Sequence, residues 1–528
     1  MTSWRTPLDR LLLLTGSGAL LGFAGGGAAW VLLHLIRFIT NAAVFGHLGV
    51  NPPTFRHLHT SPRLFVVAVL GALIVSLLAK WAPVIRGHGI PEAMEVVLTK
   101  RSRISPQTAV AKPISAAIAI GTSAPFGAEG PIIVTGGALG SLLGQVIHVS
   151  AAERKILLAC GAAAGMAATF GAPLASVMLA VELLLFEFSA RSLLPLIVAT
   201  CVAGAVHTAI IGTGPLFHVP AYHYPGLGSL PAFALLGLAC GVLAAVVVKG
   251  LFLVETAYRR LPVSEFWHPM IGAVLFVAVG SLAPRALGVG YDAIGDVLTN
   301  RLTLGTVAVL GLVKLVSWWF ALGSGTSGGT LAPILLISAS FGALAGNGIN
   351  HVLPGPAIAL GAFAVVAMAA TFGAATRATF TSIVFVFELT RNYNVVVPLM
   401  LAVALADLVF NALSEHSIMT EKLHRRGVRV GRFYGVDPLV TTTVAEIMSQ
   451  ANGTHPRLDG PVVTSLDRAI TALDVLLDND IAEVPVVDGG ELVGVCTHAD
   501  LLRARAHDRR AERRLVEDRL NLRRRRES

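Results

Sequence analysis

The sequence predicts an all-α membrane protein of many spans, followed by a small α/β domain at its C-terminal end. Three observations indicate this fold class. Of the 528 residues, 54% are hydrophobic and only 13% are charged, whereas soluble proteins carry roughly 25% charged residues. Apolar runs recur from Leu11 to Leu413 without a long polar stretch between them, as expected of one integral membrane unit. Beyond Leu423 the chain becomes polar, so we expect a separate domain there.

The first apolar run, Leu11 to Ile36, follows Arg5 and Arg10 and has the outline of a secretory signal. It is longer than the apolar region of a signal peptide, and further spans follow it, so we expect it to be retained as a membrane helix. The membrane domain is then expected to cover residues 1–430, the polar domain residues 431–505 and a basic tail residues 506–528.

The membrane part contains an internal repeat. A shift of 202 residues, the separation of Gly121 from Gly323, aligns the two halves without a gap, and Met166–Ala172 recurs letter for letter as Met368–Ala374. The same shift pairs Lys112 with Lys314, Ser115 with Ser317, Pro131 with Pro333 and Gly140 with Gly342. Duplicated halves with Gly/Pro-interrupted hydrophobic segments are typical of transporters whose substrate binds between the repeats.

Two corresponding stretches, Gly121–Pro131 and Gly323–Pro333, contain too many glycines and prolines for ordinary helix. Each precedes about fifteen apolar residues suited to a helix. A helix N-terminus exposes unpaired N–H groups and attracts anions. Because irregular backbone at membrane depth must be buried in protein or line a wet cavity, these breaks predict an anion pathway. The alternative is that the glycines and prolines only let helices pack closely. A third break, Gly87–Glu92, is weaker evidence by itself.

Glu129 is an ionisable residue in this apolar neighbourhood, which marks it as a functional candidate. Beside a helix N-terminus its carboxylate can occupy the position that an anion would use, and protonation would release it. We therefore predict that Glu129 is the gate of the pathway. The alternative is a carboxylate that only caps the helix.

Three motifs together resemble a known family. Gly87–Pro91, Gly127–Pro131 and Gly329–Pro333, in this order, are similar to the anion-binding motifs of the CLC chloride channels and transporters. The resemblance implies a homodimer with one pore per subunit, inverted repeats of broken helices, and Glu129 as the gating glutamate. It also implies anion-binding positions at His88, Gly89, Ile90, Gly127, Ala128, Gly130, Thr330, Leu331 and Met419.

The chain departs from the family pattern at several of these positions. His88 replaces a pore serine, Ala128 replaces a basic residue, and Met419 stands where an anion-coordinating tyrosine is expected. Two side-chain hydroxyl donors are therefore missing. Backbone N–H groups can still hold an anion, and His88 either donates into the pore or is only packed. Chloride is the expected anion, with fluoride, nitrate and bicarbonate as alternatives.

Leu183 occupies the position where exchangers of this family often carry an internal proton-accepting glutamate. Without that carboxylate a channel is the favoured expectation, and a proton-coupled chloride antiporter is the alternative. The neighbouring Glu182 and its repeat counterpart Glu388 are expected to be structural carboxylates at helix ends.

The polar domain resembles a CBS module. Ser465–Leu477 predicts a helix with Ser465 as its N-cap, and Glu483–Thr497 predicts a strand–turn–strand unit followed by a helix from His498. The segment Val440–Gln450 is expected to supply an entry strand and helix. CBS modules act in pairs, so a single copy implies pairing across the dimer.

Two residues of this CBS-like domain, Thr497 and Asp500, have two possible roles. In the family resemblance they hold the ribose and phosphate of an adenine nucleotide. They fit equally well as a helix cap.

Charge and composition limit the location, the partners and the other functions that we expect of this protein. The net charge of +9 lies largely in short loops and in the tail, which predicts a cytoplasmic C-terminal domain and a tail that contacts anionic lipid. The family resemblance implies an inner (plasma) membrane protein, bacterial in type. Nucleic acid is not an expected partner, and the cysteines show no metal-site or disulfide spacing. Gly325–Gly329 fits the Gly-x-Ser-x-Gly pattern, so an intramembrane hydrolase using Ser327 is a remote alternative. We expect no enzyme, no metal and no other cofactor.

Overall fold

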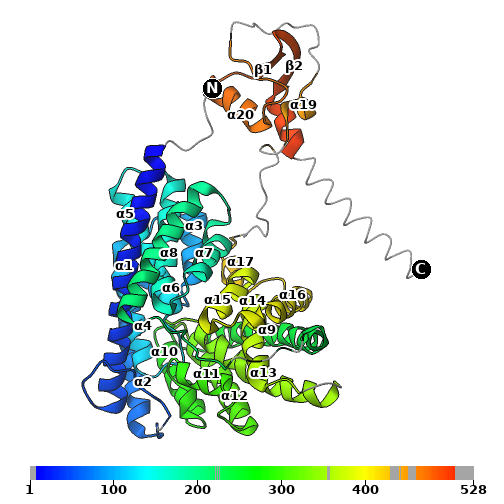
Figure 1. Cartoon of the computed structure of the whole chain (residues 1–528). Helices are drawn as coiled ribbons and strands as arrows, with labels where there is room; N and C mark the ends of the chain where they lie inside the picture. Colours follow the sequence, from blue (N-terminus) through cyan, green and yellow to red (C-terminus); the bar gives the residue numbers. More distant parts are fainter. Residues whose placement is uncertain are drawn as a thin grey trace. The chain divides into compact units, whose positions relative to one another are not determined.

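A computed structural model describes residues 8–428 except 57, 221, 223, 225 and 354–356, together with residues 439, 442–449 and 460–505. The chain divides into two compact units, Met1–Gly431 and Arg432–Ser528. The first is helical, and the second carries the two strands (Figure 1).

The first unit is built from long and short helices. Among the described residues, seven helical segments are long and apolar enough to cross a membrane. The helices are α1 (Leu8–Thr40), α2 (Pro62–Trp81), α3 (Ile90–Thr99), α4 (Pro106–Gly121), α5 (Glu129–Val146), α6 (Ala151–Phe170), α7 (Pro173–Ala180), α8 (Ala190–Ile210), α9 (Leu230–Arg259), α10 (His268–Gly280), α11 (Tyr291–Leu298), α12 (Leu304–Gly323), α13 (Leu331–Val352), α14 (Leu360–Thr376), α15 (Thr379–Thr390), α16 (Val396–Leu413) and α17 (Glu421–Arg425). Short 3-10 or π-helical segments are η1 (Asn41–Phe45), η2 (Pro83–Ile85), η3 (Val181–Leu185), η4 (Gly226–Ser229), η5 (Pro284–Ala286) and η6 (Tyr393–Val395).

The predicted helix breaks are present. The helices α5 and α13 begin at Glu129 and Leu331, so Pro131 and Pro333 lie in their first turns, where the missing N–H costs no helical hydrogen bond. The third break ends at α3, whose N-cap Gly89 has a φ of 97°, a conformation that favours glycine.

Two buried lysines reveal the repeat in three dimensions. Lys112 Nζ donates to the carbonyls of Ile85 and Gly87 at 2.7 and 2.8 Å, and so fixes the turn before α3. Lys314, its repeat counterpart, donates to two carbonyls of the turn before α11 at 2.9 and 2.7 Å. The turn before α11, which the sequence comparison did not single out, is therefore a fourth break equivalent to the third.

Glu182 and Glu388 connect the two halves reciprocally. The carboxylate of Glu182 accepts the backbone N–H groups of Phe380 and Thr381 at the start of α15, at 3.0 and 2.9 Å. The carboxylate of Glu388 accepts the corresponding two N–H groups at the start of α7, at 3.1 and 2.7 Å. Both are helix-end carboxylates, as predicted. Each caps a helix of the other half, the reciprocal arrangement that two repeats related by a pseudo-two-fold axis produce.

The second unit contains the predicted strand–turn–strand. β1 (Glu483–Asp488) and β2 (Glu491–Thr497) pair antiparallel, from Glu483 opposite Thr497 to Asp488 opposite Glu491. The turn consists of two glycines with positive φ, which is why this dipeptide ends the first strand. The predicted helix follows over residues 498–505. A small core of valine, alanine and leucine side chains holds these elements to α19 (Val444–Ile447) and α20 (Ala469–Asp478).

The helix predicted to start at Ser465 is displaced. α20 begins at Ala469, so Ser465 is not its N-cap. The backbone carbonyls of Ser465 and Asp467 instead accept the N–H groups of Ala445 and Val444, at 2.9 and 2.8 Å. This segment therefore pairs with the entry helix α19, an interaction that the local helical pattern does not reveal. The ends of the predicted entry segment, Val440 and Gln450, lie outside the described residues.

Candidate functional site

The site lies where the breaks of the two halves meet. Gly127 and Gly329, one from each repeat, form an antiparallel bridge: the N–H of Gly329 donates to Gly127 at 2.9 Å, and the N–H of Gly127 donates to Gly329 at 3.4 Å. Gly87 pairs in turn with Ser327 in a parallel bridge. The turns that precede α3, α5 and α13 are thus joined through their backbones.

The glycines at this junction are required by close backbone approach. A Cβ on Gly130 would overlap the carbonyl oxygen of His88, and a Cβ on Gly89 would collide with the carbonyl of Gly130. The first and second motifs therefore touch main chain to main chain. This packing brings the N-termini of α3 and α5 together in the protein interior, where unpaired N–H groups favour negative charge.

Glu129 lies at the centre of this junction and is completely buried. Its Oε1 atom accepts the backbone N–H of Ala332, in the first turn of α13, at 3.2 Å. Its Oε2 atom is buried against the backbone of Gly127 and Gly329 and has no hydrogen-bond partner among the described residues. The carboxylate that begins α5 thus occupies the N-terminus of a helix from the other half.

The structure adds Tyr291, which sequence reasoning missed. Its hydroxyl donates to Glu129 Oε1 at 3.3 Å, and its ring packs edge-on against Phe170 and Phe217. The sequence does contain a sign of this residue, but at a different shift from the rest of the repeat. Gly288-Val-Gly-Tyr291 matches Gly87-His-Gly-Ile90 at a shift of 201 residues, one less than the shift that aligns the rest of the repeat.

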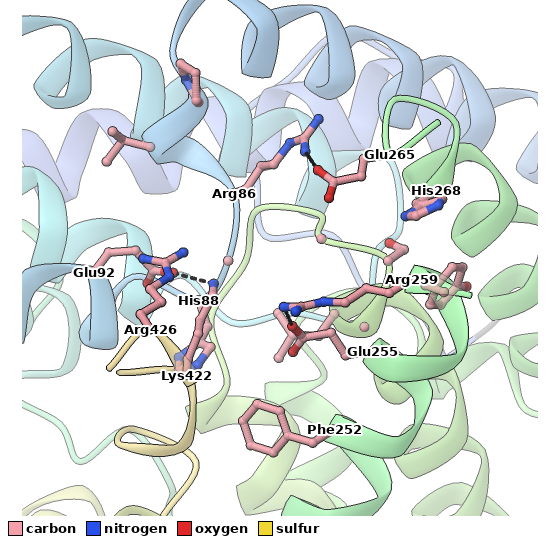
Figure 2. A pocket seen from close by; sticks show the side chains of 18 of the residues that line it. Arg86, His88, Glu92, Phe252, Glu255, Arg259, Glu265, His268, Lys422 and Arg426 are labelled. Atoms are coloured by element: carbon pink, nitrogen blue, oxygen red, sulfur yellow. Dashed lines mark hydrogen bonds and ion pairs between the residues drawn. The ribbon is translucent and has the colours of Figure 1, made fainter. Parts of the chain in front are cut away.

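His88 lines a cavity of about 440 Å³ that we call the vestibule. Its side chain is 4% exposed, and its Nδ1 atom is buried without a hydrogen-bond partner among the described residues. Figure 2 shows the surrounding charged side chains, which come from α3, α9, α17 and the connecting loops. The histidine thus borders an open space, and its role in anion binding stays a prediction.

Ion pairs surround the vestibule. Lys422 Nζ lies 2.7 Å from Glu92 Oε1, the pair joined by a dashed line in Figure 2, and Arg426 pairs with Glu95. Lys422 lies in α17 and Arg426 directly follows it, so both pairs join this segment to α3. Two further pairs, Arg86–Glu265 and Arg259–Glu255, lie on the remaining walls. Each of these four cations faces a carboxylate, so the paired charges nearly balance along the vestibule walls, to which Lys100 adds a further cation.

The other predicted anion-binding residues are buried at the helix starts. Ile90 and Leu331 are the first residues of α3 and α13, and Ala128 and Thr330 are the N-caps of α5 and α13. Met419 is fully buried just before α17. Leu183 is buried in η3. The structure therefore groups the three motifs at one place, while the role of each residue in anion binding stays a prediction.

Ser327 does not have the surroundings of a hydrolase nucleophile. Its hydroxyl is buried and accepts a hydrogen bond from Ser115 Oγ at 3.2 Å, so its partner in the part of the chain that the structure describes is a second serine and not a general base. The Gly-x-Ser-x-Gly pattern here belongs to the helix break before α13.

Thr497 and Asp500 form a helix cap in the second unit. Asp500 Oδ2 accepts the N–H and the hydroxyl of Thr497 at 3.0 and 2.6 Å, and Asp500 Oδ1 accepts the hydroxyl of Ser449 at 3.0 Å. Arg503 lies 3.3 Å from the same oxygen. The capping role is thus realised, and nucleotide binding by these residues stays a prediction.

These features define a membrane transport protein built from two repeats of broken helices. Comparison with known proteins identifies its family. The family model described as voltage gated chloride channel matches residues 70–411, and a CBS domain model matches residues 443–507. The chain belongs to this family, the CLC proteins, which are membrane transporters and not enzymes.

Three relatives illustrate the match. Over 431 residues the chain is 30% identical to an H(+)/Cl(−) exchange transporter ClcA of Vibrio parahaemolyticus, which covers 80% of this chain and 90% of that protein. A slow cyanobacterial Cl−/H+ antiporter of known structure is 25% identical, with a TM-score of 0.69 over 80% of this chain and 99% of its own. A CLC-type fluoride/proton antiporter shares the fold, at 19% identity and a TM-score of 0.65 over 79% and 99%.

Proposed function

We propose that this protein exchanges chloride for protons across the membrane, with Glu129 as both gate and proton carrier. One observation carries the proposal: the Glu129 carboxylate occupies the N-terminus of α13 and accepts the N–H of Ala332. A helix N-terminus inside a membrane protein is a site for a small anion. The carboxylate therefore stands where a chloride ion would bind, and the pathway is closed while it stays there.

The same contact explains how a proton opens the pathway. The deprotonated carboxylate competes with chloride for the N–H groups at the starts of α5 and α13. Protonation removes the negative charge, so the dipoles of both helices then favour an incoming anion over the neutral side chain. Glu129 leaves with its proton, and chloride takes its place. One proton and one anion binding event are thereby linked at a single residue.

The absence of a carboxylate at Leu183 favours a channel when the sequence is taken alone. The comparisons support the alternative, because the ClcA relative and the cyanobacterial protein are both described as exchangers of chloride and protons. We propose the vestibule, bordered by His88 and Glu92, as the route by which protons approach the site in place of the missing side chain. We therefore propose exchange as the activity.

Chloride is the proposed anion, held by backbone N–H groups at the helix starts and by His88 if its free Nδ1 donates. Fluoride stays the alternative, because a fluoride/proton antiporter has the same fold. It ranks second because that likeness extends to the fold alone. We also propose a homodimer, a bacterial plasma membrane location, and a cytoplasmic second unit.

The deciding experiment is transport by the purified protein in liposomes. Vesicles loaded with chloride are placed in a low-chloride medium, and proton movement is followed with a pH-sensitive dye. Exchange predicts that chloride leaving the vesicles drives protons inward against a proton gradient. Chloride flux without uphill proton movement would establish a channel instead. Efflux of fluoride with no chloride flux would refute the chloride assignment.

A further inference from the structure

The donors around Glu129 Oε1 describe an anion site that the carboxylate now fills. Two groups point at this oxygen from the second half of the chain: the backbone N–H of Ala332 at 3.2 Å and the hydroxyl of Tyr291 at 3.3 Å. Neither donor lies in α5, the helix that carries Glu129: Ala332 belongs to α13 and Tyr291 to α11.

Tyr291 is held independently of Glu129. It is the first residue of α11 and follows Gly288 and Gly290, whose φ values are 60° and 85°. Lys314 Nζ donates to the carbonyl of Gly288 and fixes this turn.

Aromatic contacts fix the Tyr291 ring as well. Phe170 and Phe217 lie edge-on to it, with centroids at 6.4 and 6.2 Å and interplanar angles of 77° and 70°. Such pairs restrict the ring, so the hydroxyl is positioned in advance for whatever negative group occupies the site.

We infer that Tyr291 is an anion ligand, whose hydroxyl donates to the transported anion when that anion replaces the Glu129 carboxylate. This inference rests on the proposed function, since it assigns a further ligand to the same site. The chain lacks the side-chain hydroxyls that the resemblance led us to expect, because His88 and Met419 occupy those positions. Tyr291 supplies a hydroxyl from a different element and a different half.

The test separates a ligand of the anion from a residue that only holds Glu129. Purified Glu129→Ala protein has the site vacated, so any effect of Tyr291 in that background is an effect on the anion. Chloride is titrated into Glu129→Ala and into Glu129→Ala/Tyr291→Phe by isothermal calorimetry. Phenylalanine keeps the contacts to Phe170 and Phe217 and removes only the hydroxyl. The matched control is Glu129→Ala/Tyr393→Phe, since Tyr393 is 77% exposed in η6.

We expect the Tyr291→Phe change to weaken chloride binding about tenfold, as for a lost hydrogen bond to a charged partner. The Tyr393→Phe control should bind chloride as the Glu129→Ala parent does. Equal affinity of the parent and of the Tyr291→Phe variant would overturn the inference while leaving the proposed function intact. Failure of the parent itself to bind chloride would instead overturn the proposed site and the inference with it. Equal melting temperatures of the three proteins establish that the variant is folded.

Discussion

Glu129 illustrates how one residue can be costly and useful at once. A buried carboxylate inside a membrane protein loses its hydration, and only donors from the protein replace it. Here one oxygen receives two donors, from Ala332 and Tyr291, while the other is buried without a partner among the described residues. This uneven set of donors is what the proposed gate requires: a carboxylate held in the site by one oxygen and able to leave it once protonated.

Replacing Glu129 with glutamine tests its role as proton carrier. Glutamine has nearly the same shape but no titratable group and no charge, so the site is no longer closed by a carboxylate. We expect Glu129→Gln to conduct chloride with no proton movement and no dependence on pH, whereas the wild-type flux should rise as the pH falls, because protonation releases the carboxylate. Liposome flux at a series of pH values measures this. A pH dependence equal to that of the wild type would count against the gating role.

Substitutions at His88 test whether its Nδ1 atom donates a hydrogen bond to the anion. If Nδ1 donates to chloride, His88→Ala should weaken chloride binding by about fivefold to tenfold, the effect of one hydrogen bond. His88→Ser restores a hydroxyl donor and should retain most of the affinity. Calorimetric titration with chloride distinguishes them. Equal affinities of the wild type and both variants would show that His88 is only packed.

At the scale of elements, the breaks work because backbones meet without side chains between them. Gly130 lies against the carbonyl of His88, and Gly127 is bridged to Gly329 across the repeat. Four helix starts are aimed into one region by these contacts and by the two lysines, Lys112 and Lys314, that fix the turns before α3 and α11. The glycines are therefore part of the site's architecture and not flexible joints.

This packing predicts a difference between two glycines. Gly130→Ala places a Cβ against the His88 carbonyl and should destabilise the protein by about 1–3 kcal/mol, as overpacking does. Gly348→Ala, in α13, meets no atom within 4 Å and should be neutral or stabilising by up to about 1 kcal/mol through helix propensity. Thermal unfolding of the detergent-solubilised variants compares them. Similar melting temperatures for both variants would refute the close-approach explanation.

The reciprocal caps give a second prediction at this scale. Glu182→Gln weakens the cap of α15 and should lower stability by about 1 kcal/mol, the typical contribution of a cap. Because Glu182 is engaged by Phe380 and Thr381, the stoichiometry of chloride and proton movement should be unchanged. Melting temperature and liposome coupling ratio are measured on the same preparation. Loss of coupling with unchanged stability would make Glu182 a proton relay.

At the scale of the membrane unit, the proposed anion site belongs to neither half alone. Glu129 and α5 come from the first repeat, whereas Ala332 and Tyr291 come from the second. If the proposed function holds, an anion at this place bridges the halves as the carboxylate does. Ligand binding to the folded state then stabilises the whole unit by mass action.

We accordingly expect chloride to raise the melting temperature, and to raise it most in Glu129→Ala, where no carboxylate competes. At a chloride concentration of about 100 times the dissociation constant, the stabilisation should approach ~2.7 kcal/mol. Melting curves in chloride are compared with curves in the same concentration of gluconate, a large anion. Identical curves in the two salts would argue against a site shared by the halves.

The sequence by itself determined the features that local physics controls. Low charge and long apolar runs require a membrane, since hydrocarbon tolerates only segments that satisfy their own backbone. The shift of 202 residues revealed the repeat, and Gly127–Pro131 and Gly329–Pro333 revealed the breaks, because glycine and proline interrupt a helix wherever it is placed. Glu129 stood out for the cost of its charge in that setting.

Only the tertiary structure decided which residues from distant parts of the chain come into contact. Tyr291 is 162 residues from Glu129, and Lys422 is 330 residues from Glu92, so no local pattern links either pair. The fourth break was concealed because it matches the third at a shift of 201 residues and not 202. Ser465 does not cap α20, because its backbone pairs with α19. Packing sets these contacts, because a backbone hydrogen bond or a hydroxyl donor takes the partner that the fold brings within reach, however far away it lies in the chain.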